Sequence, residues 1–462
     1  TLNGVNNGAQ ENILLSYLAR VNYSLSDKYL FTASVRADGS ARFGPENRFG
    51  YFPSAAVAWK LKQESFLKDV RFIDDLKLRA SYGAIGNQPN TNYQYFITYS
   101  AGRDPVFNGE RTSSIAPTRS ANPELQWESA QQFDLGIDFG LIKSRVSGSI
   151  DYYNRRTSNL LYSVPQPLSS GFAARIENVG SMKNTGLELA LNGTVIDNRD
   201  FKFDANFNIT TLKNEVLSLG EVEEFIGTGP GSIGEYSILK PGESMGSFYG
   251  YIVDGVWQTG DDFSTAMPGV RPGDLKYRDQ DGNNKIDAGD RVILGNSLPD
   301  FYYGFNTNLS YKALSLSVAL EGSHGAKMLN SSLVDAYYPV DFRRNKLADL
   351  YLNRWTSANP SNEYPSFIPG DPQGVRQITN KTVEDASYLR LQSVRLAYDL
   401  PLPKNKYISR ASVFINGQNL HTFTKYSGVD PAVNAIGDDI LRVDYNSYPL
   451  TRTFTGGINI QF

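Results

Sequence analysis

Hydrophobic and polar residues alternate with a period of two along much of this 462-residue chain. In "DFYYGFNTNLSYKALSLSVALEG" (residues 300–322), the odd positions from Phe301 to Tyr311 are aromatic or aliphatic apart from one threonine, and most residues between them are Asn, Gly or Ser. The alternation restarts after Lys312, and the even positions from Leu314 to Leu320 then form the apolar face. A period of two indicates strands, and two such runs joined by a short turn indicate a hairpin. The apolar face therefore points either into a protein core or into lipid.

The same alternation recurs along the chain and predicts six hairpins followed by one terminal strand, about 13 strands in all. A short helical turn is expected within residues 62–75. The links inside hairpins are mostly short, whereas those between hairpins are long: 37–52, 83–130, 154–185, 211–300, 322–385 and 419–452. The predicted strands are residues 15–23, 29–36, 55–61, 76–82, 133–139, 145–152, 187–191, 201–209, 301–311, 314–320, 388–400, 411–420 and 452–462.

A regular alternation of short and long links is typical of an outer-membrane barrel, which has short periplasmic turns and long extracellular loops. The polar faces are mainly Ser, Asn, Gly, Asp and Thr, as suits a wet lumen, and Tyr residues gather near strand ends, where membrane interfaces favour them. We therefore predict an all-β, transmembrane antiparallel β-barrel whose apolar faces contact lipid. A large soluble β-protein, with its apolar faces meeting in a core, is the alternative.

Composition narrows the possible functions. The net charge of −3 argues against a nucleic-acid partner, and the absence of cysteine excludes disulfides and thiol chemistry. The chain has only two histidines, and no apolar run approaches the roughly 18 residues that a membrane-spanning helix needs. Because no GxSxG, HExxH, P-loop or CxxC motif occurs, we expect no enzymatic activity.

The stretch "DQDGNNKIDAGD" (residues 279–290) has the spacing of a calcium-binding loop. Oxygen ligands at every second residue, turned by Gly and Asn, suit a hard cation. Two positions depart from an EF-hand, since Asn284 replaces the usual glycine and the last acidic residue is Asp instead of Glu. An Asx turn with solvated carboxylates is the competing interpretation. The expected ligands of a structural Ca²⁺ are Asp279, Asp281, Asn283, the carbonyl of Lys285, Asp287 and Asp290.

Two loop stretches are rich in aromatic residues, residues 246–263 and 334–345. Aromatic rings could stack on a sugar or contact a peptide, but they could equally pack against one another or against a partner protein. We favour packing and predict no substrate-binding residues.

Several longer stretches resemble SusC/RagA-like TonB-dependent outer-membrane transporters. "YLRLQSVRLAYDLPLP", "ASVFINGQNLHTFTKYSGVDPAV" and "YPLTRTFTGGINIQF" are similar, in order and spacing, to the C-terminal region of that family. "RFGPENRFGYFPSAAVAWKLKQESFL", "LKLRASYGAIGNQ", "NPELQWESAQQFDLGIDF" and "VGSMKNTGLELALNGT" resemble its middle region. The resemblance covers essentially the whole chain.

The resemblance implies a 22-stranded barrel in the outer membrane of a Gram-negative bacterium, filled by an N-terminal plug. It also implies a SusD-like surface lipoprotein as partner, energy from TonB, and a glycan or peptide as cargo. Residues 1–462 resemble only the C-terminal portion of such a barrel, so we expect the plug, the TonB-contacting segment and the first strands to lie on a remaining N-terminal segment. Because lipid cannot satisfy open strand edges, the fragment should need that segment to close.

Three functions remain open at this point. The first is active import of a nutrient, and the second is a passive porin or a surface adhesin carried on a barrel. The third is a soluble glycan-binding β-protein. A plug with a TonB-binding sequence would favour the first of these, and extraction without detergent would favour the last.

Overall fold

The structure is a computed structural model. It describes residues 11–89, 91–101, 105–112, 114–228, 233–264, 266, 268–337, 345–367, 378–402, 407–434 and 442–462. The chain divides into two compact units, one of residues 1–144, 149–186 and 216–221, and one of residues 145–148, 187–215 and 222–462. Among the described residues, no helix is long and apolar enough to cross a membrane.

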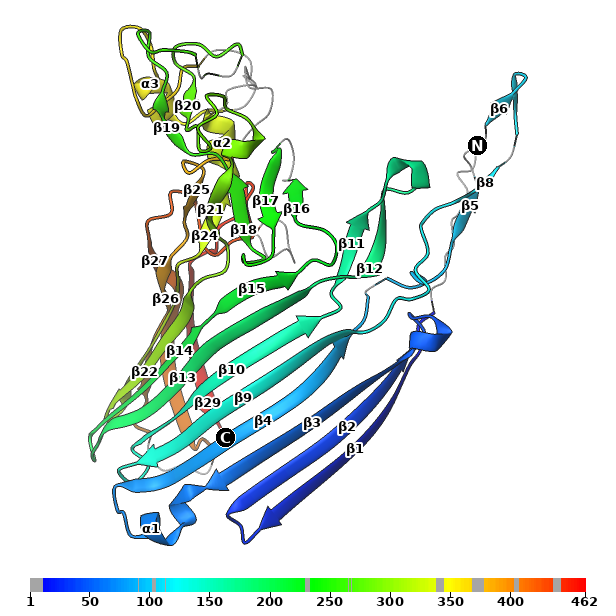
Figure 1. Ribbon diagram of the computed structural model, residues 1–462. Helices are drawn as coiled ribbons and strands as arrows, with labels where there is room; N and C mark the ends of the chain where they lie inside the picture. The colour runs from blue at the N-terminus through cyan, green and yellow to red at the C-terminus, as the bar shows by residue number, and fades with distance from the viewer. Residues whose placement is uncertain are drawn as a thin grey trace. The chain divides into compact units, whose positions relative to one another are not determined.

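The first unit is built on six long strands, which pair in the order β1-β2-β3-β4-β9-β10 and lie side by side (Figure 1). Only residues 26–28 join β1 to β2, and Ser26 and Asp27 both have φ near +54°, the left-handed geometry that tight hairpin turns use. The helix α1 (Ser65–Lys68) follows the 3₁₀ turn Leu61–Gln63 between β3 and β4, which confirms the predicted helical turn. The six strands are β1 (Leu14–Leu25), β2 (Tyr29–Ser40), β3 (Phe49–Lys60), β4 (Ile73–Asn87), β9 (Glu128–Leu141) and β10 (Val146–Ser158).

The loops of this first unit carry shorter elements. A 3₁₀ turn, Pro45–Asn47, joins β2 to β3, and another, Leu168–Ser170, lies between β11 and β12. The short strands pair as β5 with β8, β6 with β7 and β11 with β12. Their bounds are β5 (Tyr99–Ala101), β6 (Val106–Phe107), β7 (Glu110–Arg111), β8 (Ile115–Pro117), β11 (Leu161–Pro165) and β12 (Ala174–Asn178).

The second unit holds seven long antiparallel strands in the order β13-β14-β22-β23-β26-β27-β29. With the six strands of the first unit they match the number predicted from the alternation. They are β13 (Ser181–Asp197), β14 (Phe201–Thr211), β22 (Phe301–Tyr311), β23 (Leu314–His324), β26 (Tyr388–Asp399), β27 (Arg410–Thr424) and β29 (Thr453–Gln461).

The long loops of the second unit contain many short elements. These lie beyond one end of its long strands, where α2, α3, β19 and β20 are grouped (Figure 1). The helices are α2 (Ser331–Tyr337) and α3 (Ala348–Asn353), and the 3₁₀ turn is Ala288–Asp290. The short strand β15 (Lys213–Ser218) differs from these, because it pairs with the long strand β13. The loop strands are β16 (Phe225–Thr228), β17 (Glu235–Leu239), β18 (Ser247–Gly250), β19 (Val253–Val256), β20 (Leu275–Tyr277), β21 (Val292–Asn296), β24 (Lys327–Asn330), β25 (Val383–Asp385) and β28 (Val443–Asp444).

No residue that the structure describes covers the apolar faces of the long strands. In the first unit, the relative exposure of Val57 is 47% and that of Leu135 is 50%; in the second, that of Ile415 is 64%. The strand register keeps apolar residues on one face, since Leu78 pairs with Ile137 and Phe305 pairs with Leu320. A continuous apolar surface of this extent on long strands is what lipid contact requires.

The first predicted connection, residues 37–52, is shorter than the sequence suggested. Strand β2 continues to Ser40 and β3 begins at Phe49, so only residues 41–48 join them. Gly39 pairs with Phe49, and a Cβ on Gly39 would lie 2.7 Å from the Phe49 ring. The missing side chain therefore makes room for the ring, and the ladder extends beyond the region where the alternation is visible. At its other end, β3 stops at Lys60, because Leu61 already belongs to the 3₁₀ turn.

Candidate functional site

The polar face of β4 and β9 carries a ladder of charged and hydroxyl groups. Asp138 lies 2.6 Å from the Lys77 ammonium and accepts two hydrogen bonds from the Arg79 guanidinium, at 2.7 and 2.9 Å. Arg79 also donates to Asp151 of β10 at 2.8 Å. These groups alternate with the exposed apolar residues of the same strands, so the face opposite to the lipid side is polar and hydrogen-bonded. Such a surface suits a water-filled interior.

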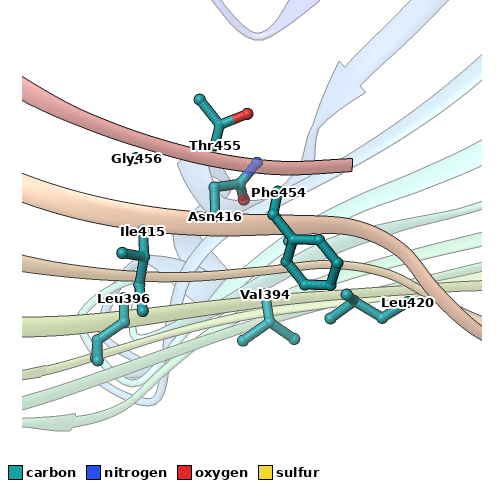
Figure 2. A pocket seen from close by; sticks show the side chains of 9 residues that line it. Val394, Leu396, Ile415, Asn416, Leu420, Phe454, Thr455 and Gly456 are labelled. Atoms are coloured by element: carbon teal, nitrogen blue, oxygen red, sulfur yellow. The ribbon is translucent and has the colours of Figure 1, made fainter. Parts of the chain in front are cut away.

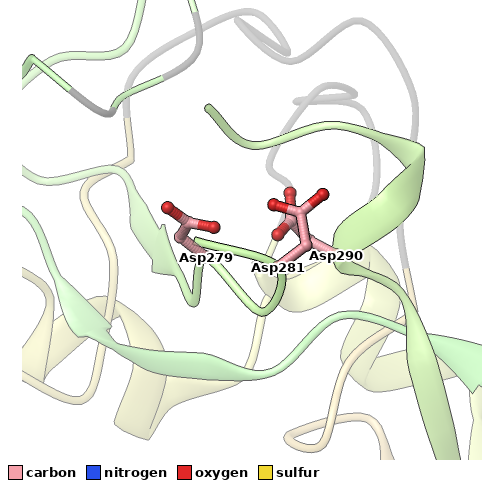
Figure 3. Close-up of side chains that lie close together, drawn as sticks. All are labelled: Asp279, Asp281 and Asp290. Atoms are coloured by element: carbon pink, nitrogen blue, oxygen red, sulfur yellow. The ribbon is translucent and has the colours of Figure 1, made fainter. Parts of the chain in front are cut away.

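The acidic loop 279–290 lies between β20 and β21. Carboxylate oxygens of Asp279, Asp281 and Asp290 come within 4.8 Å of one another (Figure 3). Two oxygens that both bind one Ca²⁺ at about 2.4 Å can be at most about 4.8 Å apart, so this spacing fits a single ion. Asp290 is fully buried; its carboxylate accepts hydrogen bonds from the backbone N–H groups of Gln280 and Asp287, both at 2.7 Å.

Among the predicted carboxylate ligands, Asp287 is not part of this convergent group. Asp287 caps the 3₁₀ turn Ala288–Asp290, and its carboxylate accepts from the N–H of Gly289 at 2.8 Å. The Asn283 side-chain oxygen accepts from the N–H of Lys285 at 2.7 Å, while its amide donates to Asp281 at 3.0 Å. Asn284 adopts φ of +61°, so the position at which an EF-hand has glycine is in the left-handed region here.

The aromatic stretch 246–263 packs into a core. Phe248, Tyr251 and Trp257 are at most 3% exposed. The backbone of Tyr251 exchanges hydrogen bonds with residues from a distant part of the chain: its N–H donates to Ile378 and its carbonyl accepts from Asn380. These aromatic side chains are therefore closed to a ligand, as the packing interpretation expects. In the second stretch, 334–345, Val334 is buried, and residues 338–344 lie outside the described part of the chain.

A large hydrophobic cluster joins the long loops of the second unit. Its buried members come from every long connection between Leu212 and Arg452, although up to 210 positions separate them in the sequence. Trp355, Tyr364 and Phe367 pack against it from residues 345–367. The buried members are Ile233, Tyr236, Phe248, Tyr251, Val253, Val256, Leu275, Tyr277, Leu329, Val334, Leu350, Ile378, Val383 and Val443.

Sequence reasoning missed a buried ion pair at the loop end of β26. The Arg390 guanidinium donates to Asp430 at 2.6 Å, and the two side chains are 3% and 6% exposed. Arg390 also donates to the hydroxyl of Thr422 at 3.0 Å, and one of its nitrogens lies 3.5 Å from Glu321. Alternation places Arg390 on the polar face of its strand, but nothing in the sequence points to a partner 40 residues further along.

A second buried polar contact fixes the same region. The Tyr426 hydroxyl donates to Asp444 at 2.9 Å, and both residues are buried. Burial raises the pKa of Tyr426, and the hydrogen bond to Asp444 raises it further. The phenol therefore stays protonated and keeps its role as a donor. This contact joins two parts of the segment between β27 and β29, and the Arg390–Asp430 pair ties that segment to β26.

Comparisons with known proteins agree with this architecture. A family described as TonB dependent receptor-like, beta-barrel, matches residues 6–420. TonB-dependent receptor P3 of Formosa agariphila is 37% identical over 467 residues, which cover 98% of this chain and 46% of that protein. TonB-dependent receptor SusC of Bacteroides thetaiotaomicron is 32% identical over 98% of this chain and 44% of its own length. The chain thus spans about half the length of these relatives.

Solved structures give the same result. The structure of the RagAB peptide transporter matches 98% of this chain and 48% of its own chain, with a TM-score of 0.82 and 28% identity. Its open-open state matches with a TM-score of 0.81. These proteins are named as receptors and transporters and not as enzymes, which agrees with the absence of catalytic motifs. The chain therefore belongs to the TonB-dependent receptor-like β-barrel family, in its SusC/RagA type, whose members are outer-membrane proteins of Gram-negative bacteria.

Proposed function

We propose that this chain is the C-terminal portion of the barrel of an active importer, which takes up a glycan or an oligopeptide with TonB energy and a SusD-like surface lipoprotein. The observation that carries the proposal is the match over 98% of the chain to a solved peptide transporter, at a TM-score of 0.82. The polar ladder on β4, β9 and β10 supports it, because hydrophilic cargo needs a hydrated wall.

The buried aromatic residues of stretch 246–263 support capture through a partner protein more than direct contact of these rings with the cargo. Phe248, Tyr251 and Trp257 are at most 3% exposed, so these three rings cannot stack on a sugar ring. The packed loops instead form a preorganised surface on which a lipoprotein could dock. A passive porin or a surface adhesin is the alternative function, and it would need neither TonB nor such a partner.

Uptake in the producing bacterium tests the proposal. Wild-type cells, a deletion strain and a TonB-depleted strain would be given fluorescent oligopeptides and oligosaccharides of matched size. We expect one cargo class to enter wild-type cells only, and an epitope-tagged full-length protein to co-purify with a surface lipoprotein. Uptake that persists without TonB would favour the porin, and surface binding without any uptake would favour the adhesin.

We also propose that the acidic loop 279–290 holds one structural Ca²⁺. Asp279, Asp281 and Asp290 would supply the convergent carboxylates, with Asn283, the Lys285 carbonyl and Asp287, directly or through water, completing the shell. The ion would order the chain before β21. Elemental analysis and proteolysis of the full-length protein test this proposal. We expect EDTA to speed cleavage of the loop in the wild type but not in Asp279→Ala/Asp281→Ala. Equal cleavage with and without EDTA, together with no bound calcium, would support the solvated Asx turn instead.

A further inference from the structure

The outward surface of β26, β27 and β29 offers lipid an apolar groove of about 450 Å³ (Figure 2). Val394, Ile415 and Phe454 are among the nine residues that line it, and none of the nine is charged. Such a groove has room for acyl chains, but it holds no charged group that could select a headgroup. The outward surface of the first unit differs, because two cations stand on it near the loop end of the strands.

Gln131 of β9 and Arg156 of β10 lie opposite each other. Gly136 and Asp151 fix this register, because a Cβ added at Gly136 would collide with the Asp151 carboxylate. The hairpin agrees, since β9 ends and β10 begins five residues from that pair. Five residues from the same pair in the other direction, towards the loops, Gln131 and Arg156 therefore stand opposite each other.

Lys183 of β13 extends this row to a third strand. The N–H of Val179 donates to the carbonyl of Leu160 at 2.8 Å, just beyond the ends of β13 and β10. Residues joined by such a bond stand opposite each other in an antiparallel pair. Four residues back from this contact, Lys183 therefore stands opposite Arg156. Residues 128–141, 149–158 and 181–186 all belong to the first unit, so the whole row lies within it.

The row faces outward. Asp151 belongs to the polar, ion-paired face, so Arg156, five residues further along the same strand, points to the opposite face. Gln131 shares its face with Leu135, which is 50% exposed. Directly opposite residues share a face of the sheet, so Lys183 points outward as well.

The charges of the row are unpaired. No side-chain hydrogen bond or ion pair of Arg156 or Lys183 is found among the residues that the structure describes. Gln131 accepts a hydrogen bond from the Tyr82 hydroxyl at 3.0 Å, which leaves its NH₂ group as a donor. The same registers place three serines in the next outward row towards the loops: Ser129, Ser158 and Ser181. On these three strands the two rows therefore offer two positive charges and several hydrogen-bonding groups, and no acidic side chain.

The row lies at the level of lipid headgroups. Gln131 is ten residues from Leu141, where β9 ends at the short turn, which is about 34 Å along the strand. A strand tilted by about 40° rises about 26 Å over that length, and the apolar band of an outer-membrane barrel is about 25 Å tall. Below the row, the outward residues Leu135, Ile137 and Ile150 are apolar and exposed. The cations therefore stand where the outer hydrocarbon ends.

We propose that Gln131, Arg156 and Lys183 bind the headgroup of a phosphorylated glycolipid of the lipid A type, the lipid class of the outer leaflet of this membrane. A phosphate would lie between the two cations, where the Arg156 guanidinium can donate two parallel hydrogen bonds to it. Sugar hydroxyls would meet Gln131 and the serines, and the acyl chains would lie over the apolar residues below.

Three observations favour this occupant: the two unpaired charges, the absence of an acidic side chain from the two rows on these strands, and the level of the row at the edge of the hydrocarbon. The outward face meets lipid and not cargo. The site is therefore independent of whether the barrel acts as an importer, a porin or an adhesin.

Native mass spectrometry of the full-length protein in mild detergent tests the site. The probes are lipid A with its phosphate groups, the same lipid A after a phosphatase has removed them, and soluble glucosamine 1-phosphate. We expect the wild type to prefer the phosphorylated lipid A. Arg156→Gln and Lys183→Gln should each weaken its binding by about fivefold, the contribution of one cation near an anionic membrane surface. The double variant should bind both forms of lipid A alike, whereas Arg156→Lys keeps the charge and should retain most of the affinity.

Two other cations of the same hairpin serve as matched controls. Arg155 is adjacent in the sequence but points to the opposite face, and Lys143 lies in the turn at the other end of the hairpin. Arg155→Gln and Lys143→Gln should bind lipid A as the wild type does. If Arg155→Gln weakened binding as much as Arg156→Gln, the site would not be on the outward face. Equal binding of the dephosphorylated lipid A, or displacement of lipid A by millimolar glucosamine 1-phosphate, would also overturn the proposal.

Discussion

The ion pair between Arg390 and Asp430 should be the strongest single anchor of the segment that follows β27. Replacing Arg390 by alanine would leave the Asp430 carboxylate, which is 6% exposed, without its cation. Breaking a buried pair in this way typically costs about 3–5 kcal/mol. Because every 1.4 kcal/mol is a factor of ten, local opening of residues 425–434 should increase by roughly two to three and a half orders of magnitude.

Replacing the other partner, Asp430, should reduce the stability by less. Asp430→Ala leaves Arg390 with Glu321 at 3.5 Å, the Thr422 hydroxyl at 3.0 Å and the Tyr388 ring at 5.1 Å. Replacing both partners with leucine should recover much of the lost stability, since buried pairs are often matched by apolar residues of similar size.

Limited proteolysis of the full-length protein in detergent measures these effects, because cleavage within residues 425–434 follows the population of the locally open state. Arg410 and Asp399 provide the control, as they form a comparable 2.6 Å pair with exposed side chains, 65% and 43%. Arg410→Ala should change cleavage little, since such pairs contribute about 0–1 kcal/mol. If Arg390→Ala were cut no faster than Arg410→Ala, the anchoring role would be wrong.

Three further predictions address the barrel itself. Leu316→Cys should resist a water-soluble maleimide in intact cells while Ser317→Cys reacts; the opposite order would show that the strand faces are assigned the wrong way round. Residues 1–462 expressed alone with a secretion signal should not give a heat-modifiable, protease-resistant barrel, because among the described residues β1 pairs only with β2 and β29 only with β27; recovery of such a barrel would refute this. Hydrogen bonds from Trp59, Tyr29 and Lys28 lower the pKa of Glu64. These contacts are therefore present at neutral pH and are lost only as the pH falls below the ordinary value of 4.5. Fluorotryptophan NMR of Trp59 should show a transition with that low midpoint, and Glu64→Gln should abolish the transition.

The long strands could be predicted from the sequence because each is a local pattern. A strand of 11 residues such as β22 displays its alternation within its own length, and its partner β23 follows after two residues. The residues at which the long strands begin and end were less predictable. Gly39 extends β2 through its contact with Phe49, and the bulge between Leu391 and Ser393 interrupts the alternation on β26.

The loop core could not be predicted in the same way. Its strands are only two to five residues long, too short for a period to be visible. Its contacts also join residues far apart in the chain, as when the N–H of Val253 donates to the Asn380 side chain across 127 positions. The acidic loop is an intermediate case, since spacing alone brought Asp279, Asp281 and Asp290 together but could not place Asp287 at the cap of a 3₁₀ turn.

The shared loop core has a consequence for biogenesis. Its members extend from Ile233 to Val443, so it cannot be completed until the loop before the last strand has reached the cell surface. Until that moment Phe248, Leu329 and Ile378 are not fully buried, and the emerging loops would be accessible to surface proteases and chaperones. An antibody that recognises only the packed loops would therefore report finished insertion of the barrel, and could be used to time its assembly in living cells.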